Sequence, residues 1–323
     1  MALPGFDQFR AAVACADRAG VSSRAMADPT PRLTAYVLLA GSMALVGSYV
    51  ALSKPLTAAI PVFALAFLRF AIAAIAMVPW TVPARTDTAL TRTEHRLFFV
   101  MSFFGNFLFS ICMLYGVSMT TATAAGVILA TLPAVVALLS WLILHERLSG
   151  RVMLAVVLAV GGVGLLQLAR PDDPAARGTA WLGTLLMFGA VVCEATYVIV
   201  AKRLAATRAP LRVSALVNLW GLVLITPFGL WQLARFDLGS LSAPIWGLLV
   251  FYSLAASLFA VWMWVAGLKH VPASQAGVFT VALPLAATAV GVFILGESFT
   301  PIHAVSLALA TAGVVLITTG RQP

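Results

Sequence analysis

The feature that most constrains this chain is a succession of long apolar runs. From Thr34 onward, runs of about 17–25 residues alternate with short polar breaks, and a helix of ~20 apolar residues is what a ~30 Å bilayer core requires. The breaks are too short to hold a soluble domain. We therefore predict an all-α polytopic membrane protein with ten transmembrane helices, near residues 34–53, 60–79, 97–115, 121–144, 152–168, 180–201, 213–231, 244–266, 273–295 and 302–319.

The composition supports a lipid environment. Hydrophobic residues make up 62% of the chain and charged residues only 10%, whereas soluble domains carry about 25% charged residues to solvate their surface. The net charge of +9 comes from cations scattered between apolar runs, without the basic stripe of a nucleic-acid-binding protein. The sequence contains no CxxC, HExxH, GxxxxGK[ST] or GxGxxG motif. We expect no cofactor, no metal and no nucleic-acid partner, and any uphill transport must use a gradient.

The cations also predict an orientation. With the N-terminus inside, fifteen Lys and Arg fall on the cytoplasmic side and four (Lys54, Arg170, Arg177 and Arg235) on the other; Arg69, within a span, completes the twenty. By the positive-inside rule, both termini are predicted to be cytoplasmic. Residues 1–33 form a mixed polar tail without the apolar core of a signal peptide, and translation could begin at Met1 or at Met26.

The second half of the chain repeats the first. At an offset of 151 residues, Gly116 through Glu146 aligns with Gly267 through Glu297 without gaps, and Pro133 falls on Pro284. Near the start of each half the offset is 148, which places Tyr49 on Tyr197. Residues 34–168 and 180–320 then hold five spans each. Because five is odd, the two repeats are predicted to be inverted, as in transporters that alternate around a midplane site.

The residues that repeat also resemble a known family. The segment Gly47 to Lys54, the triplet Leu68-Arg69-Phe70 and the stretch from Gly116 to Arg147 look like EamA-type members of the drug/metabolite transporter superfamily. The resemblance extends over roughly residues 34–320. It implies a secondary transporter of small molecules, most similar to bacterial amino acid exporters of the inner membrane.

Polar residues at helical spacing predict a central cavity. Four predicted spans, related as two inverted pairs, each carry a polar or aromatic stripe, and polar groups facing lipid would be costly. In the third span the stripe is Ser102, Asn106 and Ser110, at i, i+4 and i+8. Single Ser side chains are also compatible with interhelical hydrogen bonds. The candidate substrate-binding residues are Ser42, Tyr49, Asn106, Glu194, Tyr197, Tyr252, Ser257 and Trp264.

Two charged residues lie well inside predicted spans. An unpaired arginine at the depth of Arg69 costs from ~3 to over 10 kcal/mol, depending on the scale used. Arg69 either binds a substrate carboxylate or forms a structural pair between helices. Glu194 could pair with Arg69, bind a substrate amine or accept a proton, so uniport and proton coupling both remain open.

Two repeated pairs are candidates for movement. Pro133 and Pro284 each remove a helical hydrogen bond near mid-membrane and are predicted hinges, with static kinks as the alternative. Glu146 and Glu297 end the fourth and ninth spans on opposite faces and are predicted to close gates or cap helices, with solvated helix ends as the alternative. No nucleophile with its base appears at bilayer depth, so no enzyme is expected.

We therefore predict a secondary transporter that exports amino acids or related small metabolites across the bacterial inner membrane by alternating access. The alternative is efflux of cationic drugs, for which a cavity rich in aromatic residues and acids is expected. The sequence does not distinguish among oligomeric states.

Overall fold

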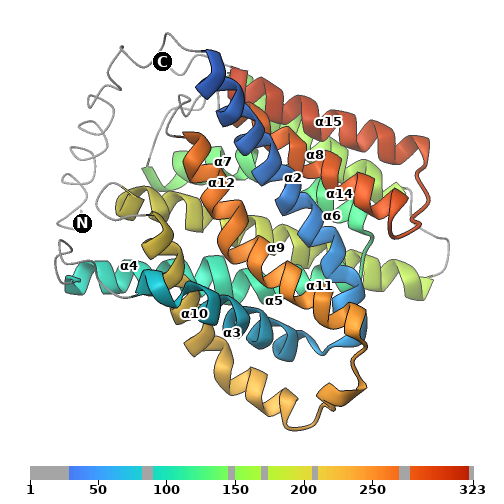
Figure 1. The fold of residues 1–323 in the computed structure, drawn as a ribbon. Coiled ribbons are helices and arrows are strands. Elements are labelled where there is room, and N and C mark those ends of the chain that lie inside the picture. Colours follow the sequence, from blue (N-terminus) through green and yellow to red (C-terminus); the bar gives the residue numbers. More distant parts are fainter. Residues whose placement is uncertain are drawn as a thin grey trace, which may run out of the picture.

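The computed structural model describes residues 29–81, 90–144, 150–168, 174–205, 210–268 and 277–319, and these contain helices but no strand. Thirteen α-helices account for most of them (Figure 1). Their bounds are α2 Pro29–Ala59, α3 Val62–Thr81, α4 Arg92–Ser102, α5 Phe109–Ser118, α6 Ala122–Leu129, α7 Leu132–Leu144, α8 Gly150–Leu168, α9 Pro174–Ala205, α10 Pro210–Leu233, α11 Ala243–Leu254, α12 Ala260–Leu268, α14 Ala282–Phe293 and α15 Pro301–Thr319.

Every predicted span overlaps one of these helices or a consecutive pair. Six described segments are long and apolar enough to cross a membrane: Leu33–Ala59, Val62–Thr81, Arg92–Ser118, Ala180–Tyr197, Leu211–Leu233 and Ala243–Trp264. Four shorter apolar helices lie at Ala122–Val136, Met153–Val163, Phe279–Phe293 and Pro301–Leu316. The chain is thus a multi-pass membrane protein whose described residues form helices and no strands, whereas ten crossings in two inverted repeats remain a prediction.

The third and eighth predicted spans are not uniform α-helices. Each contains a π-helical segment, Phe103–Leu108 between α4 and α5 and Ala255–Phe259 between α11 and α12. A π-helical turn takes more residues than an α-helical turn, so the side chains that follow it are rotated around the helix axis. Such segments occur often at functional sites.

The fourth and ninth predicted spans are also interrupted, just before their prolines. α6 ends at Leu129 and α7 begins at Leu132, so Pro133 is the second residue of α7. A 3₁₀ segment, Gly277–Val281, precedes α14, in which Pro284 is the third residue. The first turn of a helix tolerates proline because its N–H would have no intrahelical partner there. The predicted kinks are therefore helix breaks that lie ahead of the prolines.

The helices pack in an ordered set of pairs. α3 packs on α10, α8 on α15 and α6 on α14. In addition, α2 packs on α12 and α14, while α9 packs on α5 and α7. The start of α2 and the end of α15 lie on the same side of the bundle (Figure 1).

The surface of the bundle is strongly apolar. Ile75 on α3 is 75% exposed and Phe293 at the end of α14 is 86% exposed, and they belong to a large set of exposed apolar side chains distributed over nearly all helices. The interior instead contains buried polar residues, among them Ser42, Arg69, Asn218 and Ser257. This inversion is expected when the solvent of the outer surface is lipid.

Candidate functional site

Arg69 lies in the interior of the bundle, on α3, with only 5% of its surface exposed. Its Nη1 donates a hydrogen bond to Ser110 Oγ on α5 at 3.0 Å. Its guanidinium carbon lies 4.6 Å from the centroid of the Phe70 ring and 5.4 Å from that of Tyr252 on α11. The negative faces of aromatic rings attract a desolvated cation. Two rings and one neutral hydroxyl thus surround this charge.

Two of the three tyrosines predicted to bind substrate lie together here. The rings of Tyr49 on α2 and Tyr252 meet edge to face, with centroids 5.7 Å apart, and both side chains are buried. Tyr252 is fully buried, yet its hydroxyl has no hydrogen-bond partner among the described residues, and neither does Nε of Arg69. Buried polar atoms are rarely left unpartnered. We call Tyr49, Arg69, Ser110 and Tyr252 the central cluster.

Glu194 and Tyr197 approach this cluster from α9. Glu194 is partly buried and lies close enough to Arg69 for an electrostatic interaction, but no ion pair joins the two. The predicted Arg69–Glu194 pair is therefore not formed in the described part of the chain. The Tyr197 ring packs against Gly105, where an added Cβ would collide with it. Gly105 belongs to the first π-helical segment, so the lack of a side chain there admits the tyrosine.

The stripe predicted on the third span is divided in the structure. Ser102 Oγ and Asn106 Nδ2 both donate to the backbone oxygen of Val217 on α10, each at 2.9 Å, whereas Ser110 accepts from Arg69. The prediction that the three residues share one face assumed an uninterrupted α-helix. The π-helical segment Phe103–Leu108 lies between Ser102 and Ser110 and includes Asn106, so the spacing of the three residues is not that of a regular α-helix. That they line one pathway stays a prediction.

The second π-helical segment makes matching contacts with α10. Ser257 Oγ donates to Asn218 Oδ1 at 3.2 Å, and Asn218 Nδ2 in turn donates to the Phe70 oxygen on α3 at 3.1 Å. Ser214 Oγ donates to the Ser257 oxygen at 2.9 Å. Asn218 did not figure in the sequence prediction, although a lone amide in an otherwise apolar run was a usable signal.

Ser42 and Trp264 lie apart from the central cluster. Ser42 Oγ donates to the Ala260 oxygen at 2.7 Å and links α2 to α12. Trp264 packs with Phe279 against Ala35 and Leu39, near the start of α2. Ser42, Asn106 and Ser257 thus all have interhelical hydrogen-bond partners, as the alternative interpretation of their spacing predicted. Substrate contacts of these residues remain predictions.

Glu297 forms a charged junction between three segments. It lies between α14 and α15, and its Oε1 accepts from Lys54 Nζ and from the Ala122 N–H, both at 2.7 Å. Its Oε2 accepts from the N–H and the hydroxyl of Thr123, both at 3.0 Å. The carboxylate therefore caps the start of α6 and ties it to the Lys54 turn of α2. Glu146, its counterpart in the repeat, lies outside the described residues.

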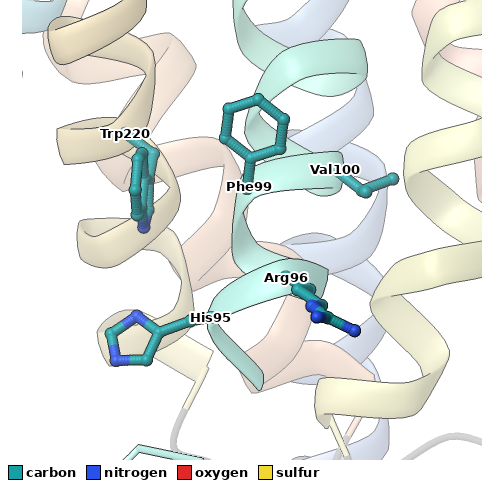
Figure 2. Close-up of a pocket in the computed structure, with 5 residues that line it drawn as sticks. All are labelled: His95, Arg96, Phe99, Val100 and Trp220. Carbon is teal, nitrogen blue, oxygen red and sulfur yellow. The ribbon is translucent and has the colours of Figure 1, made fainter. Parts of the chain in front are cut away.

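A groove opens between α4 and α10. It has a volume of about 420 Å³, and His95, Arg96, Phe99 and Val100 line it from α4, with Trp220 opposite on α10 (Figure 2). The Phe99 and Trp220 rings meet edge to face at 5.7 Å. The groove contains none of the predicted substrate-binding residues.

Comparisons with known proteins agree on the kind of protein. The model of the EamA-like transporter family matches residues 33–168 and 181–319. The uncharacterized transporter YetK of Bacillus subtilis strain 168 is 34% identical over 90% of this chain and 89% of its own length. YwfM, another uncharacterized transporter of that strain, is 32% identical over 61% of this chain and 65% of its own length. The family resemblance expected from the sequence is confirmed.

A solved crystal structure has the same overall fold. It superposes with a TM-score of 0.59 and covers 87% of this chain and 95% of its own, at 17% sequence identity. At that identity the likeness concerns the fold alone.

Proposed function

Because the chain belongs to the EamA-like transporter family, we propose that it exports amino acids or related small metabolites across the bacterial inner membrane. In this proposal ten spans form two inverted five-helix repeats that expose a central site to each side in turn, with both termini in the cytoplasm. The observation that carries it is the central cluster: a buried arginine with two buried tyrosines in an otherwise apolar bundle.

Helix packing supports the inverted repeat. If the first five spans correspond to the last five, α2 corresponds to α9 and α5 to α12. The contact of α2 with α12 then has its counterpart in that of α9 with α5. The contact of α2 with α14 likewise has its counterpart in that of α9 with α7. When the two halves of a chain are related, exchanging one half for the other should map each helix contact onto another observed contact, as it does here.

The irregular helices give independent support. Shifted by the offset of 151 residues, the first π-helical segment falls on residues 254–259, and the second occupies Ala255–Phe259. The same shift moves the break before Pro133 to residues 281–282, where the 3₁₀ segment meets α14 ahead of Pro284. Such interruptions are tolerated in a membrane where neighbouring helices or a cavity satisfy the backbone.

The Glu297 junction offers a means of closing one side. It joins the end of α2 to the start of α6, and it ends the span that contains Pro284. We assign the same role on the opposite face to Glu146, through its position in the repeat, and we assign Pro133 and Pro284 as the hinges between the two states.

Transport by reconstituted protein tests the proposal. Purified protein in proteoliposomes is loaded with unlabelled solute, and counterflow of each of the twenty labelled L-amino acids is followed beside labelled tetraphenylphosphonium. We expect saturable counterflow of one or more amino acids and none of the cation. Counterflow of the cation alone would instead favour drug efflux.

A further inference from the structure

The guanidinium of Arg69 is incompletely satisfied. Arg69 is 5% exposed, and its Nε has no hydrogen-bond partner among the described residues. Its one side-chain hydrogen bond in that part of the chain goes to the neutral Ser110 hydroxyl. An intramembrane arginine normally has a counter-charge or water, because its desolvation is expensive. Within the described residues, Arg69 therefore lacks the counter-charge that a buried arginine normally has.

A second unsatisfied donor lies beside it. The Tyr252 hydroxyl is close enough to the Arg69 guanidinium to interact with it, but no hydrogen bond of good geometry joins it to Arg69 or to another described residue. Tyr252 is held by its ring, which packs edge to face on Tyr49 and beneath the guanidinium. Packing of the ring does not explain why the residue is tyrosine and not phenylalanine.

The Glu194 carboxylate does not serve as the counter-charge of Arg69. Glu194 interacts electrostatically with Arg69 but forms no ion pair with it. The described part of the chain thus places a hydroxyl beside a cation whose Nε has no partner, and no carboxylate of that part forms an ion pair with the cation. A planar group with two charged oxygens is the natural complement of a guanidinium edge, because both oxygens can be bound at once.

We propose that Arg69 and Tyr252 form an anion-binding site that holds the carboxylate of the transported solute. The inference rests on the proposed function and deepens it. One carboxylate oxygen accepts from Arg69 Nε, and the other accepts from the Tyr252 hydroxyl. The Phe70 and Tyr252 rings flank the cation and exclude water, which strengthens both hydrogen bonds. Glu194, of opposite charge, lies on the α9 side, where it favours a solute that also carries an amine.

The Tyr252→Phe variant gives the sharpest test, with Tyr115→Phe on α5 as its matched control. Since the Tyr252 hydroxyl has no partner, its removal should leave the unfolding temperature of the purified protein unchanged. It should nevertheless raise the KM for counterflow of the labelled L-amino acids about 10-fold, equivalent to ~1.4 kcal/mol. Tyr115→Phe should change neither quantity.

Competing solutes test the carboxylate itself. In wild-type proteoliposomes, methyl esters of L-leucine, L-phenylalanine and L-threonine should inhibit counterflow at least 10-fold less well than the parent amino acids. In Arg69→Gln this preference should disappear. Esters that compete as well as the acids, or a Tyr252→Phe variant with wild-type KM, would overturn the inference.

The inference and the proposed function fail separately. If no amino acid is transported but labelled benzoate or succinate is, with the same loss in Tyr252→Phe, the anion site stands and amino acid export falls. If amino acids are transported with no dependence on Arg69 or Tyr252, export stands and the site falls. Transport of tetraphenylphosphonium alone contradicts both.

Discussion

Lys54 and Glu297, 243 positions apart, form an ion pair in which Nζ lies 2.7 Å from Oε1. The two partners contribute unequally to this junction. Lys54 is one of four donors to the carboxylate, the others being the Ala122 N–H and the N–H and hydroxyl of Thr123. The carboxylate is thus the organising group, and the lysine is one of its ligands.

This asymmetry predicts different costs for the two partners. Lys54→Met should lower the free energy of unfolding by about 1 kcal/mol or less, because its side chain is one-third exposed and such pairs are weak. Glu297→Gln should cost about 1–3 kcal/mol, because its amide cannot accept from every α6 donor. Denaturant unfolding of purified protein measures both, with Glu94→Gln at the exposed α4 cap as control. Equal losses at positions 54 and 297 would contradict the account.

The same junction predicts a pH dependence. Burial alone would raise the pKa of Glu297, but hydrogen bonds from Lys54, Thr123 and Ala122 outweigh it and hold the pKa below the ordinary value of 4.5. A depressed pKa in the folded state means that the stabilisation is complete above 4.5 and is lost as the pH falls through the lowered value. The difference in unfolding temperature between wild type and Glu297→Gln should stay constant from pH 7 to about 5 and shrink at lower pH.

The contact of α2 with α14 predicts a strict requirement for glycine at position 47. A Cβ at Gly47 would collide with the backbone oxygen of Leu283, the residue before Pro284, and a backbone atom cannot rotate away. Gly47→Ala should therefore destabilise the protein by about 1–3 kcal/mol or more. Gly247 on α11 has open space around it, so Gly247→Ala should be neutral or slightly stabilising. Comparable thermal unfolding of the two variants would contradict this packing.

The hinge assignment predicts a kinetic effect of the prolines. Pro133 and Pro284 lie in the first turns of α7 and α14, directly after helix breaks. Replacement by Ala supplies an N–H that allows the helix to extend across the break, which should stiffen the span and slow counterflow more than it impairs folding. Initial counterflow rates at equal reconstituted amounts measure this. If both variants transport at the parental rate, the breaks are static.

The charge bias predicts the membrane sidedness of two described arginines. Arg92 begins α4 and Arg235 follows α10, and both are exposed. A cysteine at position 92 should react with an impermeant thiol reagent only in inverted vesicles, and a cysteine at position 235 in intact cells. The opposite pattern would reverse the orientation.

Sequence reasoning located the apolar helices because their signal is local. A run such as Val62–Thr81 identifies itself through length and hydropathy alone. Repeat offsets also placed the breaks near Pro133 and Pro284 in advance. The π-helical segment Phe103–Leu108 was not predicted, because it leaves no periodic signature in the residues.

Partners across the bundle could not be predicted for a similar reason. Spacing along one helix shows which side chains share a face, but it does not show which helix lies opposite. Asn106 therefore gave no sign of its bond to Val217, and Arg69 gave none of its position over the Tyr252 ring. The Lys54–Glu297 pair likewise joins residues from different repeats.

Single cysteines can test the central claim that one interior site is open to each side in turn. The background is a variant in which Cys15, Cys112 and Cys193 are replaced by Ser. Cysteines are then placed at the four positions predicted to face the pathway and at two neighbours two positions away that serve as controls. The former are Tyr49, Asn106, Tyr197 and Ser257, and the latter are Ala51 and Leu108.

The decisive measurement is the rate of labelling by an impermeant thiol reagent in right-side-out and in inverted vesicles, with and without a transported amino acid. Alternating access predicts that the four pathway cysteines react from both sides, that the amino acid protects them, and that the two control cysteines do not react. Equal labelling of all six positions with no protection would mean that these side chains only pack the helices together, and would contradict the account.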